Sequence, residues 1–266
     1  MAPFYFAMND KLKAQLLKDI EELELTEYQE QILQELKPAI HIQLQSKKEV
    51  PIGRSKFGGK PDVPPDFVYP TYGDGKPQTF LAQLRLEDLT AFPIAKDLPP
   101  KGMLYFFHLE HPEMEDVEDS FRLLSWQCEW EDWAVIHWDG DPALLRPSEQ
   151  RTYYTYPEAE IRFEERLSGN LTELDVDYPV FSRLEKLESK HCIGLGHQLL
   201  GKPTPQQPWC FVDEEKVDEM ILLLQLDHEP ELNMEWGDAG TLYFLIDPTD
   251  LKKQDFSKCQ YEYQMG

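Results

Sequence analysis

Leu222-Leu223-Leu224-Gln225-Leu226, an apolar run that contains one glutamine, has a divergent counterpart in Phe80-Leu81-Ala82-Gln83-Leu84. A Gly-Lys-Pro tripeptide precedes each run, at 59–61 and at 201–203, and in both cases the glutamine follows the glycine by 24 residues. Shared landmarks in the same order are typical of an internal duplication. We therefore expect two divergent β-rich repeats.

The fold class follows from the periodicity around these runs. Ile40, Ile42 and Leu44 alternate with polar residues, which indicates a half-buried strand. Strand patterns are frequent, long helical patterns are few, and strands and helices do not alternate regularly, so the sequence predicts an α+β fold with mixed or antiparallel sheets. The expected divisions are an N-terminal helical segment, a first β-rich repeat with insertions and a second β-rich repeat, packed as one unit: 1–38, 39–190 and 191–266.

Two N-terminal helices are expected ahead of the repeats. Asn9 is placed to cap a helix over Lys11–Leu23, where leucine and isoleucine recur at three- and four-residue spacing. Thr26-Glu27-Tyr28-Gln29 has the pattern of a capping box for a second helix, which should end before Pro38.

The remaining elements are predicted from short apolar or alternating runs. A short helix is expected at Pro179–Leu187 and a helical turn at Asp250–Asp255, with an acidic loop at Glu110–Asp119. The expected strands are Leu81–Leu86, Met103–Leu109, Phe121–Cys128, Ala134–Trp138, Tyr153–Phe163, Met220–Leu226, Gly240–Ile246 and Cys259–Gln264.

The charge of the chain restricts its partners. Fifty acidic residues against 26 basic ones give a formal net charge of −24. Such a surface repels phosphate backbones and anionic membranes, so we expect no nucleic-acid partner. It suits either a highly soluble cytosolic protein or a surface that attracts a basic protein partner. The opening residues lack the pattern of a signal peptide and no apolar stretch approaches 18 residues, so we expect a cytoplasmic protein and no membrane contact.

Signatures of catalysis and of metal binding are absent from the sequence. The four cysteines lie far apart and form no Cys-x-x-Cys, so buried reduced thiols are expected. The histidines have no spacing typical of a metal site, although His108 and His111 beside the acidic loop are a minor alternative for a divalent ion. The Gly53–Pro61 stretch fails as a phosphate-binding loop because Pro61 cannot donate an N–H. We therefore assign no catalytic residue, no metal and no cofactor.

Gln83 and Gln225 are the first candidates for a site. A glutamine inside an apolar strand must find hydrogen-bond partners, so the pair is expected to form buried hubs that hold the glycine-rich turns. The alternative is that they line a cleft between the repeats and bind a ligand. The other candidate ligand-binding residues are His197, Trp236 and Asp238. Five glycines are expected to form structural turns: Gly58, Gly59, Gly201, Gly237 and Gly240. For Gly237 and Gly240 we expect unusual φ angles.

With these motifs in view, the chain resembles the YwqG-like family, a bacterial family classed as a domain of unknown function. The resemblance implies an α+β fold and a cytoplasmic protein, and it carries over no catalytic residue. Leu200 stands where the family often has a second glycine, and Lys202 where it often has an aromatic residue. The likeness spans about residues 40 to 264 and rests on 57–61, 80–84, 99–107, 197–203, 222–227, 236–240, 250–251 and 255–256.

Two functions are open at this point. Members of the resembled family often occur near polymorphic toxin systems, and this implies an immunity-like role in which an acidic protein covers a basic one. We therefore expect a non-enzymatic, acidic protein-binding module. The alternative is a small-molecule- or metal-binding enzyme whose cleft lies between the two repeats, near Gln83, Gln225, His197 and Asp238.

Overall fold

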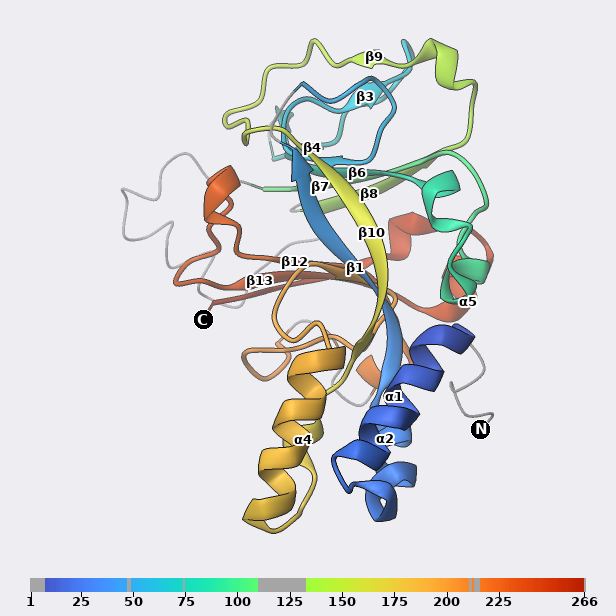
Figure 1. Ribbon diagram of the computed structural model, residues 1–266. Helices are drawn as coiled ribbons and strands as arrows, with labels where there is room; N and C mark the ends of the chain where they lie inside the picture. Colours follow the sequence, from blue (N-terminus) through green and yellow to red (C-terminus); the bar gives the residue numbers. More distant parts are fainter. Residues whose placement is uncertain are drawn as a thin grey trace.

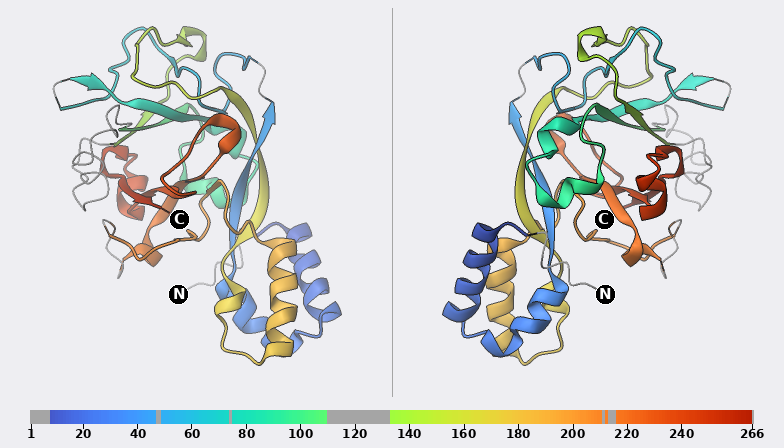
Figure 2. Two further views of the ribbon diagram at one scale, coloured as in Figure 1. Left: turned by 90° about the vertical axis from the view of Figure 1, so that its left-hand side faces the viewer. Right: turned by 90° about the vertical axis from the view of Figure 1, so that its right-hand side faces the viewer.

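The computed structural model describes residues 8–46, 49–73, 75–109, 133–210, 212 and 216–265. Within them, helices and one large antiparallel sheet form a mixed fold, as the sequence predicts (Figure 1). The sheet is strongly curled, and a lobe of three helices projects from it (Figure 2).

Ten strands make up the large sheet. Two further sheets of two strands each lie apart from it, β3 (Asp62–Val63) with β9 (Arg146–Pro147) and β4 (Thr71–Tyr72) with β5 (Lys76–Pro77). The order across the large sheet is β14 (Gln260–Gln264), β13 (Thr241–Ile246), β12 (Ile221–Asp227), β11 (Gln198–Leu199), β1 (Lys37–Ser46), β10 (Ala159–Ser168), β2 (Lys56–Phe57), β6 (Thr79–Arg85), β7 (Met103–His108) and β8 (Trp133–Trp138).

This strand order is balanced about its centre. The long strands β1 and β10 pair with each other along nearly their whole length, from Lys37 opposite Ser168 to Ser46 opposite Glu160. On one side β1 continues to β11, β12, β13 and β14, and on the other β10 continues to β2, β6, β7 and β8. In chain order, β1 to β8 form the first half of the large sheet and β10 to β14 the second. Each central strand therefore pairs with a short strand of the other half, β1 with β11 and β10 with β2.

The two outer hairpins also match in register. Gln83 pairs with Tyr105 in the β6–β7 hairpin, and Gln225 pairs with Tyr243 in the β12–β13 hairpin. Each hairpin is interrupted by an irregularity just before its glutamine, between Phe80 and Ala82 in one and between residues 222 and 224 in the other. The glutamines therefore occupy the same place in both hairpins.

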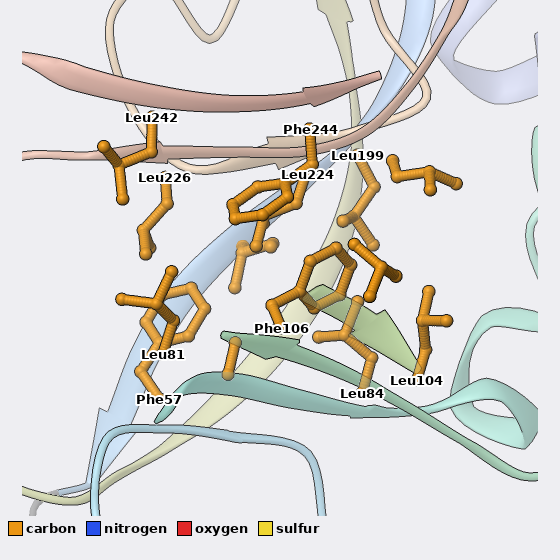
Figure 3. Close-up of a cluster of buried hydrophobic side chains, with 14 of the residues drawn as sticks. Phe57, Leu81, Leu84, Leu104, Phe106, Leu199, Leu224, Leu226, Leu242 and Phe244 are labelled. Atoms are coloured by element: carbon orange, nitrogen blue, oxygen red, sulfur yellow. The ribbon is translucent and has the colours of Figure 1, made fainter. Parts of the chain in front are cut away.

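The main core lies between the two halves of the curled sheet. The labelled side chains of the β2–β6–β7 side point toward those of the β11–β12–β13 side (Figure 3). Phe106 and Phe244 meet edge to face with their ring centroids 5.1 Å apart. Burial of these apolar strands supplies the main driving force that holds the halves together.

Side chains bring the two ends of the sheet together. The Trp133 ring of β8 stacks on Tyr261 of β14 at 5.3 Å, and its Nε1 donates to the carbonyl of Cys259 at 3.1 Å. The sheet thus curls toward a barrel, and aromatic stacking bridges its first and last strands.

The helices gather mainly in the projecting lobe: α1 (Asp10–Glu22), α2 (Gln29–Glu35) and α4 (Tyr178–His191). The short helix α5 (Pro248–Lys252) lies near the C-terminal end of the chain. The 3₁₀ turns are η2 (Thr26–Tyr28), η3 (Leu86–Leu89), η4 (Pro93–Asp97), η5 (Pro142–Leu144), η6 (Leu171–Glu173), η7 (Val217–Glu219), η8 (Pro230–Leu232) and η9 (Phe256–Lys258).

The helix ends test the capping predictions. Asn9 caps α1 as expected, because its Oδ1 accepts the N–H of Leu12 at 2.8 Å. The predicted capping box is wrong, since Thr26 lies inside the turn η2 and no side chain caps α2. Leu25 stands at the N-cap position of η2, where its carbonyl accepts the N–H of Tyr28, and Tyr28 stands at the N-cap position of α2. The end of α2 before Pro38 is confirmed.

The lobe has its own apolar core. Leu16, Ile20 and Ile32 of the N-terminal helices pack with Leu184 and Leu187 of α4. The helix predicted at 179–187 is longer than expected, because α4 spans Tyr178–His191. It packs with two helices that lie more than 140 residues earlier in the sequence.

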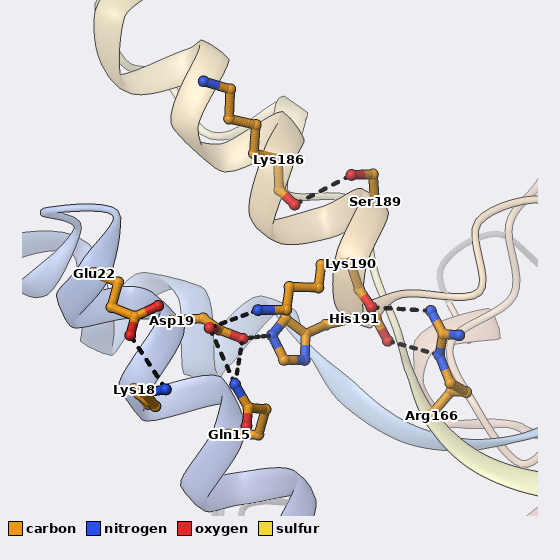
Figure 4. Close-up of polar contacts among 9 residues, drawn as sticks. All are labelled: Gln15, Lys18, Asp19, Glu22, Arg166, Lys186, Ser189, Lys190 and His191. Carbon is orange, nitrogen blue, oxygen red and sulfur yellow. Dashed lines mark hydrogen bonds and ion pairs between the residues drawn. The ribbon is translucent and has the colours of Figure 1, made fainter.

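A buried carboxylate ties α1 to α4 (Figure 4). The Asp19 side chain, 2% exposed, accepts hydrogen bonds from His191 Nε2 and Lys190 Nζ, each at 2.7 Å, and from Gln15. Burial opposes its ionisation, but these hydrogen bonds, first that from Lys190, outweigh burial and lower its pKa to about 2. Asp19 is thus ionised in the folded protein at neutral pH.

Two strand predictions need comment. The strand predicted at Tyr153–Phe163 is wrong in its start, because β10 begins only at Ala159 and runs to Ser168. The residues before it form a bend in which the Tyr156 carbonyl accepts the N–H of Gly59 at 2.8 Å, outside the sheet ladder. The strand predicted at Phe121–Cys128 and the acidic loop at Glu110–Asp119 lie outside the described residues.

None of the helices in the described part of the chain combines the length and the apolar character needed to cross a lipid bilayer.

The Asp19 cluster predicts an acid-sensitive contribution to stability. The pKa of Asp19 lies below its ordinary value of 3.8, so its ionisation stabilises the fold above about pH 4 and this contribution is lost as the pH falls toward 2. We expect Asp19→Asn to lower the free energy of unfolding by about 1–3 kcal/mol at pH 5, and much less at pH 2.5, in urea titrations. Glu21→Gln, on an exposed position of the same helix, should show no such pH dependence.

Candidate functional site

Gln83 forms the first of two buried hydrogen-bond hubs. Its side chain is 0% exposed. The Oε1 atom accepts the N–H of Asp62 at 2.8 Å, and Nε2 donates to the Arg54 carbonyl and to the Asp62 carboxylate, both at 2.8 Å. The amide therefore holds both ends of the glycine-rich bend that lies between Arg54 and Asp62.

Gln225 forms the second hub in the same way. Its Oε1 accepts the N–H of Thr204 at 3.0 Å, and its Nε2 donates to the Gly196 carbonyl at 3.0 Å. The partners stand 21 and 29 residues before the glutamine, as they do for Gln83. The predicted pair of hubs that hold the glycine-rich turns is confirmed.

A tyrosine completes each hub from the neighbouring strand. Tyr105 donates its hydroxyl to the Asp62 carbonyl at 2.6 Å, and Tyr243 donates to the Thr204 carbonyl at 2.7 Å. Burial raises the pKa of both phenols, so they remain donors over the physiological pH range. The two bends thus have matching surroundings.

Charge distinguishes the hubs. In the first, Lys56 is 2% exposed and its Nζ lies 2.7 Å from Glu158 and 3.5 Å from the buried Asp62 carboxylate. In the second, Gln198 stands opposite Gln225, as Lys56 stands opposite Gln83, and donates to its Oε1 at 3.0 Å. The first hub is therefore an ion cluster and the second a neutral amide pair. The ion pairs of Lys56 with Glu158 and Asp62 hold the first bend in place, because removing one partner of a buried pair leaves an uncompensated charge.

His197 and Trp236 both bond to the backbone of Asp227, at the end of β12. His197 Nδ1 accepts the N–H of Asp227 at 3.1 Å, which leaves the proton on Nε2, 3.5 Å from the Glu229 carboxylate. Trp236 Nε1 donates to the Asp227 carbonyl at 3.2 Å. Both rings are buried, and the His197 ring packs edge to face on Phe57 from the other half at 5.0 Å.

The predicted ligand-binding residues do not gather at one place. Gln225, His197 and Trp236 lie around the end of β12, whereas Gln83 lies in the other half of the sheet. Asp238 is exposed in the turn closed by the Gly240 N–H and the Trp236 carbonyl at 2.8 Å. Ligand binding by these residues stays a prediction.

The turn glycines are needed for two different reasons. Gly58, Gly59 and Gly237 have left-handed φ angles of 62°, 68° and 59°. The expected unusual φ of Gly240 is wrong, since Gly240 is required by close packing instead, because a Cβ there would lie 2.0 Å from the Gln264 carbonyl oxygen. A Cβ at Gly201 would likewise lie 2.5 Å from the Ala39 side chain.

The departure at Leu200 has a visible consequence. Leu200 stands in the second bend where Gly58 stands in the first, and it adopts the same left-handed conformation, with φ 64°. Its N–H donates to the Leu222 carbonyl at 2.7 Å, and the Gly58 N–H donates to Leu81, one position further along the matching hairpin, at 2.9 Å. The backbone of the second bend is thus preserved at a steric cost to a leucine.

Thiols and metal-ligating groups are dispersed. Across the described ranges, no three His, Cys, Asp or Glu side chains lie close enough together to hold a metal ion. His108 faces Tyr156, with 3.4 Å between Nε2 and the hydroxyl, and His111 lies outside the described residues. Cys192 and Cys259 are buried and unbridged, and burial raises the pKa of Cys192 to about 12, whereas Cys210 is exposed.

The α1–α2 connection and the start of α4 lie at the end of the helical lobe that is far from the sheet (Figures 1 and 2), and we call the exposed acidic residues of these segments the acidic tip. The α1–α2 connection and the start of α4 meet there, and Arg183 of α4 joins them by donating to the carbonyls of Leu23 and Glu24. The acidic tip comprises Glu21, Glu22, Glu24, Glu27, Glu30, Asp175 and Asp177.

Two acids of the acidic tip are ion-paired, Glu22 with Lys18 and Glu24 with Arg183, each at 3.3 Å. The sequence from Asp19 to Leu36 contains no lysine or arginine, and this signal was visible without the structure. Tyr178, 80% exposed, follows the last acid of the set. A shallow hollow of about 290 Å³ lies between α2 and the segment 174–175. Sequence patterns did not predict that Asp175 and Asp177, just before α4, would lie at the same end of the lobe as the α1–α2 connection.

The fold and these hubs define an α+β protein built on one large curled antiparallel sheet. Residues 55–264 match the family described as a domain of unknown function, DUF1963. Because the match covers more than half of the chain, the protein belongs to this family. No curated protein matches the chain.

The hub geometry predicts the effect of removing an amide. Gln225→Leu leaves the Thr204 N–H and the Gly196 carbonyl without their partner, at a cost of about 1–3 kcal/mol in the free energy of unfolding. Denaturant titration should show this loss, and Gln83→Leu should cost at least as much because Asp62 loses two bonds. Gln31→Leu, on the exposed face of α2, should change stability by less than about 0.5 kcal/mol. Equal effects at all three positions would contradict the role of the hubs.

The close approach at Gly58 predicts a contrast between two glycines of similar φ. A Cβ at Gly58 would lie 2.1 Å from the Pro157 carbonyl oxygen, whereas at Gly194, with φ 66°, it would meet nothing within 4 Å. Gly194→Ala should therefore cost only the left-handed strain of about 1–2 kcal/mol. Gly58→Ala should cost clearly more, because the backbone must also move. Melting temperatures of the two variants would measure the difference.

Proposed function

We propose that this protein is an acidic, non-catalytic protein-binding module, immunity-like in that it covers a basic partner. The observation that supports the proposal is the acidic tip, which stands at the far end of a lobe that projects from the sheet (Figure 2). A projecting surface is accessible to a second protein without rearrangement of the core.

Electrostatics gives this surface a preference among partners. Complementary charge raises the rate of encounter and selects against partners of like charge. The overall charge of −24 adds a long-range field of the same sign. Tyr178 offers a large exposed ring next to the acids, and tyrosine is among the residues that contribute most to binding energy at interfaces. A basic protein surface fits both features.

The alternative function, a small-molecule- or metal-binding enzyme with its cleft between the two repeats, has less support. The space between the halves of the sheet is filled by packed apolar side chains such as Phe106 and Phe244 (Figure 3). The amides of Gln83 and Gln225 point into their own loops and bind backbone groups there.

Three narrower proposals accompany this function. We infer an internal duplication from the matching hubs, registers and strand order of the two halves. The resemblance to YwqG-like proteins supports a place within that group of the family, and the acidic composition supports a cytoplasmic location.

The proposal predicts a salt-sensitive complex that depends on the acidic tip. The variant Glu21→Gln/Glu24→Gln/Glu27→Gln/Glu30→Gln should recover at least about tenfold less of any partner that the wild-type protein retains from lysate at low salt, as quantified by mass spectrometry. Salt at about 1 M should release that partner, because the Debye length falls to about 3 Å.

A matched control separates the acidic tip from net charge. Asp66→Asn/Asp97→Asn/Glu149→Gln/Glu219→Gln changes the charge by the same amount at exposed positions elsewhere. This control should retain the partner. An equal loss in both variants, or the absence of any salt-sensitive partner, would sink the proposal.

A further inference from the structure

A pocket of about 370 Å³ lies beside the small sheet that β3 and β9 form. These two strands stand at the end of the molecule opposite the helical lobe (Figure 1). Residues between 63 and 69 line one side of the pocket and the run 146–150 lines the other. The volume falls in the range of ligand-binding sites.

Two aromatic rings, Phe67 and Tyr69, belong to the lining. The Phe67 N–H donates to the Pro64 carbonyl at 3.1 Å, which closes a turn directly after β3. The Phe67 ring then packs edge to face on Tyr105 of β7 at 5.3 Å, and the Tyr69 ring packs in the same way on Phe107 at 5.2 Å. Both rings are therefore held in place by the sheet before any ligand binds.

Three groups in the lining can still donate hydrogen bonds. Among the residues that the structure describes, the Tyr69 hydroxyl has no hydrogen-bond partner, and burial raises the pKa of this phenol, which keeps its proton. Arg146 Nη1 donates to two backbone carbonyls that precede it in the chain, and this leaves its Nε and Nη2 for a ligand. The Ser148 hydroxyl accepts the N–H of Gln150 at 3.1 Å and retains its own proton.

The charges of the lining cancel. It contains one cation, Arg146, and one anion, Glu149, and neither forms an ion pair within the described ranges. The pocket thus has a formal charge of zero in a chain whose charge is −24. An ion of either sign would be attracted by one of these groups and repelled by the other, so the pocket favours an uncharged ligand.

The surroundings of the pocket favour a ligand that extends beyond it. The pocket is partly open to solvent, whereas a free small molecule usually has most of its surface buried in its site. Val68, which stands between the two aromatic residues in the sequence, is 84% exposed, and Leu144, two residues before Arg146, is 48% exposed. Exposed apolar side chains beside a pocket are typical of a surface that binds another protein.

We propose that this pocket binds an uncharged, proline-containing segment of another protein in the polyproline II conformation. Such a segment presents apolar pyrrolidine rings, which fit a wall of Phe67, Tyr69 and Pro147. Its backbone carbonyls have no internal hydrogen bonds and can accept from Tyr69, Arg146 and Ser148. The site goes beyond the proposed function, because it lies at the opposite end of the molecule from the acidic tip and does not depend on charge.

The test uses the full-length protein and a fluorescent, end-capped decapeptide of L-proline. A Gly-Ser decapeptide of the same length is the control. In anisotropy titrations the proline peptide should bind at least about tenfold more tightly, because its backbone is already ordered. Binding should change little between low salt and about 1 M salt, unlike that of a partner of the acidic tip. In ¹H–¹⁵N NMR titrations, the shifted amides should be those of 63–69 and 146–150.

Two tyrosines give the matched variants. Tyr69→Phe removes a hydroxyl and keeps the ring, so it should weaken binding of the proline peptide about three- to tenfold. Tyr178→Phe, at an exposed tyrosine of the helical lobe, should leave binding unchanged. Arg146→Met should also weaken binding, and it tests the donors at an exposed position if Tyr69→Phe fails to fold. No binding of the proline peptide, equal binding of the Gly-Ser peptide, release by salt, or equal effects of the two tyrosine variants would overturn the proposal.

Discussion

The structure depends on the requirement that buried backbone groups be hydrogen-bonded. Two irregular, glycine-rich bends pack against a curled sheet, where regular strand pairing cannot satisfy their N–H and carbonyl groups. Gln83 and Gln225 solve this problem from inside the strands, since one amide supplies both an acceptor and donors. The bends can then lie close to neighbouring backbone, which explains the glycines at positions 58 and 201.

The exchange of central strands makes the two halves interdependent. Because β1 pairs with β11 and β10 pairs with β2, neither half contains a complete sheet of its own. The apolar faces of both halves then share one core, in which Phe106 meets Phe244. The helical lobe is attached at the same place, since α1 and α2 precede β1 while α4 follows β10. Its outward end carries the exposed acids of the acidic tip.

Sequence patterns predicted the parts whose structure is set locally. The apolar run at Met220–Leu226 and the alternation at 40–44 became strands, Asn9 became a cap, and the glutamines became hubs. One of the errors fell where distant contacts decide. The start of β10 differs from the prediction because the Tyr156 carbonyl accepts the N–H of Gly59, whereas the capping prediction at Thr26 failed for a local reason, the 3₁₀ turn η2. Whether Gln83, Gln225, His197, Trp236 and Asp238 bind a ligand is still a prediction.

The sequence by itself determined the family, the strand-rich composition, the acidic charge and the two equivalent glutamines, because periodicity, composition and motif spacing are properties of the chain. Only the tertiary structure decided which strands pair across the halves, and that α4 joins the N-terminal helices. It also placed His191 on Asp19, 172 residues away. Such contacts depend on long-range packing, which local propensities do not encode.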